Sequence, residues 1–66
     1  MFHKWVLGLW LLTGPEPNYR YTLLEAYEIH HSSQSCWRVL DGPRYNGGVR
    51  RRNDGRWIIE NCVPVR

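Results

Sequence analysis

Four side chains carry groups that could bind a soft metal ion or act as nucleophiles: His30, His31, Cys36 and Cys62. Zinc sites take four nitrogen or sulfur ligands, which usually arrive as closely spaced pairs. The chain has no Cys-x-x-Cys or His-x-x-x-His pair. Neighbouring histidines in a strand also point to opposite faces, so only one of the two could turn toward Cys36. The spacing therefore favours no metal site, and we expect no cofactor.

Cys36 could also be a catalytic nucleophile, because a thiolate near the start of a helix is stabilised and two histidines lie close in sequence. Cysteine–histidine catalysis further needs an orienting group and a cleft. A chain of 66 residues leaves little volume for a substrate pocket. The six acidic residues are scattered, without the pairing that glycoside chemistry requires. We therefore expect a protein that is not an enzyme.

The cysteines have another interpretation, as a disulfide bond. A bond between Cys36 and Cys62 would close a loop of about 27 residues and stabilise the domain by ~3.5 kcal/mol in the chain-entropy model. Domains this small often need such a cross-link, because their cores are thin. Cytosolic thiols usually stay reduced, however. The sequence leaves both a disulfide and a buried thiol pair open.

A run of three arginines, Arg50 to Arg52, is the sharpest feature expected on the surface. The net charge is +3 and the pI about 9.2. Arginine pairs with carboxylates and phosphates and stacks on rings, so the run predicts an acidic partner. An acidic protein surface is favoured over nucleic acid, because basic residues elsewhere are sparse. The alternative is a solvated loop partly neutralised by Asp54 and Glu60.

Four tryptophans are too many for one thin core, so at least one is expected to be exposed. An exposed tryptophan beside arginine is typical of an interface hot spot. Alternatively, an outer sheet face could pack on a second copy of the chain as a homodimer. The predicted partner-binding residues belong to the arginine run, to the segments just before and after it, and to the predicted helix. They are Trp37, Arg44, Tyr45, Arg50, Arg51, Arg52, Arg56 and Trp57.

Clusters of Gly, Pro, Asn and Asp at 14–18, 41–48 and 53–55 mark turns and divide the chain into segments. Residues 4–12 form an apolar run of strand length. Residues 19–30 alternate as a strand with a polar face, and a bulge near Leu24 would restore the phase that Glu25 interrupts. A helix over 22–30 is the alternative, because Leu, Glu and Ala are good helix formers.

The second half of the chain predicts a helix and a final strand. Ser32 or Ser33 is a good N-cap, and Cys36, Val39 and Leu40 form one apolar stripe over 33–40. Residues 56–63 are β-branched or aromatic, and Pro64 is expected to end the pairing. Residues 49–52 could pair with them through the turn at 53–55 or remain a mobile basic loop.

Together these segments predict a small α+β domain in β-β-α-β order, with an antiparallel sheet of three to four strands and one helix. The whole chain, 1–66, is expected to be a single domain. Residues 1–14 carry a basic start and an apolar run, which leaves a cleaved leader as a less favoured alternative. The run is too short to span a membrane as a helix.

Three stretches resemble small proteins of phages and prophages: Trp5–Trp10, Ser33–Trp37 and Asn61–Pro64. The size and element order are also similar to a phage-encoded inhibitor of bacterial RNA polymerase, although that family presents acidic residues to its target and this chain is basic. The resemblance implies a modulator or inhibitor that docks on a larger protein in the host cytoplasm. A nucleic-acid-binding accessory protein using Arg50–Arg52, and a periplasmic or secreted disulfide-stapled protein, are the alternatives.

Overall fold

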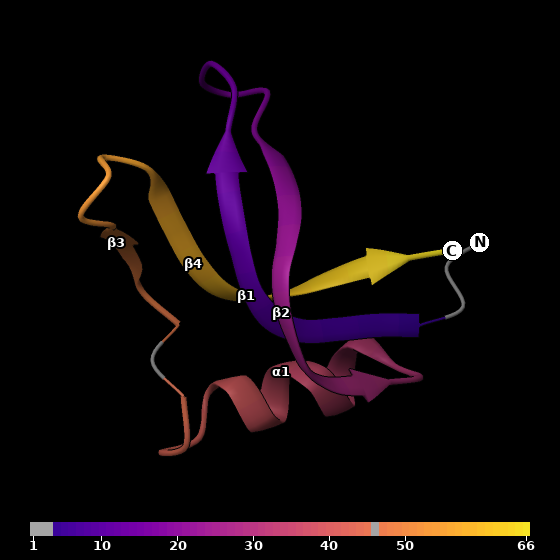
Figure 1. Cartoon of the computed structure of the whole chain (residues 1–66). Coiled ribbons are helices and arrows are strands. Elements are labelled where there is room, and N and C mark those ends of the chain that lie inside the picture. The colour runs from indigo at the N-terminus through magenta and orange to yellow at the C-terminus, as the bar shows by residue number, and fades with distance from the viewer. Residues whose placement is uncertain (1–3, 46) are drawn as a thin grey trace.

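A long hairpin of two strands begins the chain, and a helix and a second hairpin follow it (Figure 1). The computed structural model describes residues 4–45 and 47–66; residues 1–3 of the leader alternative and Asn46 of the second turn cluster lie outside this description. The elements are β1 (Lys4–Thr13), β2 (Arg20–His30), α1 (Ser33–Leu40), β3 (Val49–Arg51) and β4 (Trp57–Val65). The strands form one antiparallel sheet in the order β2-β1-β4-β3. The predicted α+β class and element order are confirmed, with the short strand formed as β3.

The second segment is a strand, not a helix, and it carries two irregularities. Leu9 pairs with Glu25 while Trp10 pairs with Leu23, so Leu24 is an extra residue in β2. The predicted bulge near Leu24 is thereby confirmed. A second shift, where β1 passes from Leu7 to Gly8, was not expected from the sequence. Bulges bend a strand and increase its local twist.

Gly8 lies opposite the bulged part of β2, whose backbone approaches it closely. A Cβ atom at this position would overlap the backbone carbonyl oxygen of Glu25 and would lie 3.2 Å from Cδ1 of Leu23. Only glycine allows the bulged strand to approach so closely. Both β1 and β4 bend near their middles (Figure 1), so the sheet has a half that lies over α1 and a half that extends beyond it.

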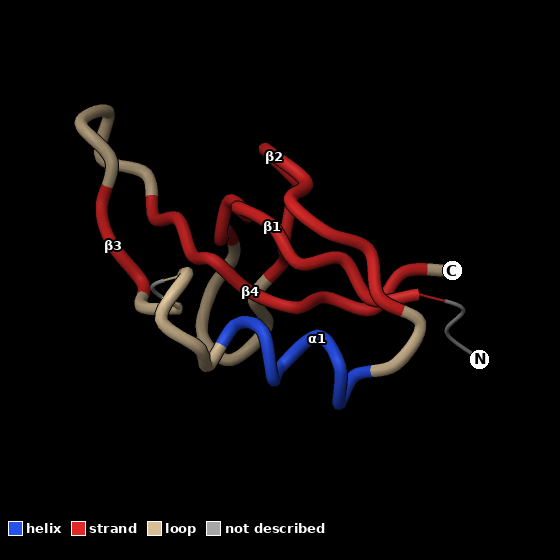
Figure 2. Tube along the Cα trace, turned by 90° about the horizontal axis from the view of Figure 1, so that it is seen from below, coloured by secondary structure: helices blue, strands red, loops and turns tan. Residues whose placement is uncertain are grey.

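Helix α1 covers one face of the sheet and is fastened to it covalently (Figure 2). Ser32 is the N-cap, and its Oγ accepts a hydrogen bond from the backbone N–H of Ser35 at 3.2 Å. Cys36 is bonded to Cys62 of β4, with 6.1 Å between their Cα atoms, so of the two alternatives left open by the sequence the structure has the disulfide. The two sulfurs are buried with Leu7 and Leu40 in the centre of the core. The predicted inner stripe of the helix is confirmed.

The expectation that Pro64 ends the last strand is wrong. Strand β4 continues to Val65, and Pro64 pairs with Trp5 of β1. Strand β3 pairs only with the first three residues of β4, as far as Ile59. Beyond Ile59, β4 pairs with β1 on one side, and no strand of the described residues pairs with it on the other. Proline is tolerated at such an edge, because no neighbouring strand needs its missing N–H.

Candidate functional site

Three of the four groups that could have done metal or thiol chemistry are held in contacts within the domain. Both cysteines are bonded to each other, so neither is available as a ligand or a nucleophile in this state. His31 is exposed in the turn before α1. Within residues 4–45 and 47–66, no group of three or more His, Cys, Asp or Glu side chains is placed to hold a metal ion.

Glu28 is the centre of a polar cluster that joins β2, α1 and the segment after the helix. Its Oε1 lies 3.0 Å from Nε2 of His30, whose Nδ1 is hydrogen-bonded to the Ser35 hydroxyl. Its Oε2 accepts from Nη1 of Arg44 at 3.2 Å and from the Tyr45 hydroxyl at 3.1 Å. Arg44 and Tyr45, two predicted contact residues, therefore have partners inside the domain. We call these five residues the Glu28 cluster.

The serine–histidine–glutamate chain within the Glu28 cluster has the residue types of a hydrolase triad, and its surroundings favour a structural role. Two cavities among the described residues lie at the far end of the β1–β2 hairpin, and neither is lined by Ser35 or His30. The Tyr45 ring also stacks on Tyr27 with 5.1 Å between centroids, which fixes the segment after the helix against β2. The cluster holds α1 and this segment on the sheet.

Acidification is expected to weaken this fastening through Glu28. Burial acts to raise the pKa of its carboxyl, but hydrogen bonds from Tyr45 and His30, with the charges of His30 and Arg44, hold the pKa below its ordinary value of 4.5. A carboxyl with a lowered folded-state pKa stabilises the fold above the unfolded-state pKa, and this contribution disappears as pH falls through the folded-state pKa. Thermal melts of Glu28→Gln and wild type should therefore differ at pH 7 and converge below pH 4.5. A difference in melting temperature between the two proteins that stays constant with pH would contradict this role of Glu28.

The sheet face turned away from α1 carries two rows of side chains that cross all four strands. Directly paired residues of neighbouring strands point to the same face. Leu7 and Cys62 pair and point to the helix side. Trp10 and Ile59, each three residues away along its strand, pair with each other and point to the opposite side. One row is Leu23, Trp10, Ile59 and Val49; the other is Tyr21, Leu12, Trp57 and Arg51. We call this surface the open face.

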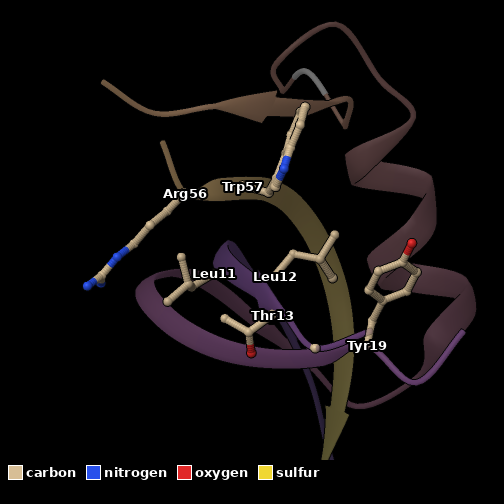
Figure 3. A pocket seen from close by; sticks show the side chains of 7 residues that line it. Leu11, Leu12, Thr13, Tyr19, Arg56 and Trp57 are labelled. Atoms are coloured by element: carbon tan, nitrogen blue, oxygen red, sulfur yellow. The ribbon is translucent and has the colours of Figure 1, made fainter. Parts of the chain in front are cut away.

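The open face is apolar and hollowed where the β1–β2 turn meets β4. Two overlapping depressions share four lining residues, Leu12, Gly14, Tyr19 and Trp57. Figure 3 shows Leu12 and Tyr19 beside the hollow, Trp57 at its edge and Arg56 extending outward. Trp10 of the neighbouring row is buried: its ring meets Tyr21 edge-on at 6.5 Å, and its Nε1–H donates to the Asn61 carbonyl at 3.1 Å.

The side chains around this hollow are unusually exposed for their type. Tyr19, Tyr21, Leu23, Val49 and Trp57 each keep between 41 and 50% of their surface accessible. Large apolar side chains gathered on one face of a small protein indicate a binding surface, whereas single exposed ones do not. The open face is therefore the candidate interaction site.

The positive charge of the chain lies at one border of the open face. The β3–β4 hairpin, residues 49–57, contains four arginines and one aspartate, whereas the rest of the chain has five basic and five acidic residues. The hairpin alone thus accounts for the net charge of +3. Asp54 lies 3.9 Å from both Arg52 and Arg56 and neutralises only part of this charge. Arg51 lies over the Trp57 ring at 5.5 Å, so charge and aromatic surface meet directly.

The predicted contact residues do not form one surface. Arg51 and Trp57 belong to the open face, and Arg56 lines its hollow. Arg50 pairs with Ile58 and points to the opposite, helix side. The exposed Trp37 lies on α1. The residues missed were those on the first hairpin and a pair of residues beside the arginine run: Leu12, Tyr19, Tyr21, Val49 and Ile59.

Comparison of the chain with protein-family models, curated proteins and solved structures gave no match. In the described part of the chain, no helix is long and apolar enough to cross a bilayer.

Proposed function

We propose that the chain is a small protein-binding module that docks on a larger protein through its open face, as a modulator or inhibitor of the kind that the phage resemblance implies. The observation that carries this proposal is the pairing of the exposed apolar rows with the basic β3–β4 hairpin along one edge. Interface hot spots favour Trp, Tyr and Arg in this arrangement. The basic edge would speed the approach of an acidic protein and orient it.

The covalent and polar fastening of the opposite face supports the same role. Cys36–Cys62 and the Glu28 cluster hold α1 against the sheet, so that face is already used by the domain itself. The open face then stays fixed in shape without a partner, and a preformed surface loses less conformational entropy on binding.

Two tryptophans of similar exposure provide a matched test of this proposal. Trp57 is 47% exposed on the open face, and Trp37 is 40% exposed on α1. Immobilised wild type, Trp57→Ala and Trp37→Ala would be incubated with extract of the native host, and each retained protein would be quantified by mass spectrometry. We expect a partner that wild type and Trp37→Ala retain, and that Trp57→Ala loses at least tenfold.

Each of the other outcomes has a definite meaning. Circular dichroism and thermal melts must first show that both variants are folded. A partner lost with Trp37→Ala and kept with Trp57→Ala would move the contact to α1 and reject the open face. If wild type and Trp37→Ala retain no protein better than Trp57→Ala does, the docking function is rejected. Salt-sensitive retention of RNA or DNA in place of protein would favour the nucleic-acid alternative.

A further inference from the structure

The shape of the open face defines the part of a partner that it can receive. Resting on the docking function above, we propose that the occupant is an extended segment of an acidic protein, with one apolar side chain in the hollow and a carboxylate against Arg51. The hollow supplies the apolar end of this site and the β3–β4 hairpin supplies the cationic end.

The hollow fits an apolar side chain better than a polar one. Its lining combines two tyrosine rings and a tryptophan with aliphatic side chains of Leu12, Val49 and Ile59. Glu16, on the β1–β2 turn, is the one carboxylate along this lining. An acidic group of the partner is therefore repelled from the turn end of the hollow and attracted to the hairpin end. The partner segment is thus oriented as well as bound.

The strand spacing sets the distance between the anchor and the carboxylate. Leu12, Trp57 and Arg51 are direct neighbours in one row across β1, β4 and β3. Adjacent strands are about 4.8 Å apart, so Arg51 is roughly 10 Å from Leu12 along the row. An extended segment advances about 3.3 Å per residue. Only alternate residues of an extended segment point to the same face, so the acidic residue should stand two or four positions from the apolar anchor in the partner sequence.

Charge argues against two other occupants of the same face. A second copy of the chain would bring another basic hairpin toward this one, because the hairpins border the open face that would be shared. A nucleic acid would need rings whose faces are free for base stacking. Arg51 already covers Trp57, and the carboxylate of Glu16 lies along the same hollow. An acidic protein segment satisfies the observed chemistry with the fewest conflicts.

A displayed library of random twelve-residue peptides provides a direct test. It would be selected on disulfide-bonded wild type and, in parallel, on Arg51→Glu and Arg50→Glu. The two arginines are adjacent and their replacement changes the net charge equally, but they point to opposite sides of the sheet. We expect wild type and Arg50→Glu to enrich peptides with an apolar residue and an acidic residue two or four positions apart, and Arg51→Glu to lose this enrichment at least tenfold.

The outcomes separate this inference from the docking function. Peptides that need Trp57 but contain no excess of acidic residues would overturn the acidic occupant and leave the docking function standing. Equal loss with Arg50→Glu and Arg51→Glu would show that only overall charge matters, and would reject the site at Arg51. Sedimentation showing a dimer lost with Trp57→Ala would assign the face to a second copy. Binding of a random 40-nucleotide single-stranded RNA that competes with the enriched peptides would assign it to nucleic acid.

Discussion

Breaking the Cys36–Cys62 bond is expected to lower the free energy of unfolding by about 3.5 kcal/mol, because the two residues are 26 positions apart and their bond restricts the unfolded chain. For a domain of this size that corresponds to a fall in melting temperature of about 15–25 °C. The loss is large because a 66-residue domain has a total stability of only about 3–10 kcal/mol. Thermal and urea unfolding of wild type, with and without dithiothreitol, measures it.

The variant Cys36→Ala/Cys62→Ala gives an independent value. It removes the bond and also leaves space in the buried cluster with Leu7 and Leu40, so it should be less stable than reduced wild type. If reduction leaves the melting temperature of wild type unchanged, the cross-link does not stabilise the fold. If the double variant equals reduced wild type, the two sulfurs contribute nothing to packing.

This result bears on the compartment in which the protein works. Disulfides persist in oxidising compartments and are rare in the cytosol. The resemblance to phage proteins implies a location in a host cytoplasm, and there the two thiols would be reduced. A reduced protein that still melts above the growth temperature of its host fits that location. A reduced protein that is unfolded there requires a periplasmic or secreted location, where the bond forms.

The local elements of this fold could be predicted because their signals are short. The alternation over 19–30 identifies β2, and the one residue out of phase predicts the bulge at Leu24. The serine before the apolar stripe at Cys36 predicts the start of α1 and the side that packs inward. Each signal depends on neighbours within a few positions, where stereochemistry and periodicity act directly.

The candidate site was harder to predict because it depends on pairing between distant segments. Arg44 and Tyr45 are 16 and 17 positions from Glu28, and nothing near them in sequence marks them as its partners. The rows of the open face require the β1–β4 register, which joins Leu12 to Trp57. Strand alternation places Arg50 and Arg51 on opposite faces of the sheet. The sequence did not predict this difference because residues 49–52 could also have been a loop.

Replacing Gly8 with alanine is expected to destabilise the sheet, although it adds only one methyl group. The added methyl group would overlap the carbonyl oxygen of Glu25, which belongs to the backbone of a bulged strand and cannot rotate away like a side chain. Either β2 moves outward and its pairing with β1 weakens, or the bend in β1 relaxes. Overpacking of this kind costs about 1–3 kcal/mol, and the absence of a flexible neighbour at the Glu25 carbonyl places the expected loss near the upper end.

Gly47→Ala is the matched control, because it makes the same chemical change at a site with space for it. The nearest atom to a Cβ at Gly47 is Cγ of Leu40 at 3.7 Å, an ordinary contact distance. The free energy of unfolding of Gly47→Ala should stay within about 0.5 kcal/mol of wild type, since a compatible glycine-to-alanine change mainly restricts the unfolded chain.

If Gly8→Ala is equally mild, the strands can separate at little cost and the bend is not held by their contact. If it is severe and also abolishes docking, the shape of the open face depends on the approach that Gly8 allows. The close approach at Gly8 and the hollow at Leu12 lie on the same strand, so one residue without a side chain would then govern both the stability of the sheet and the surface that it presents.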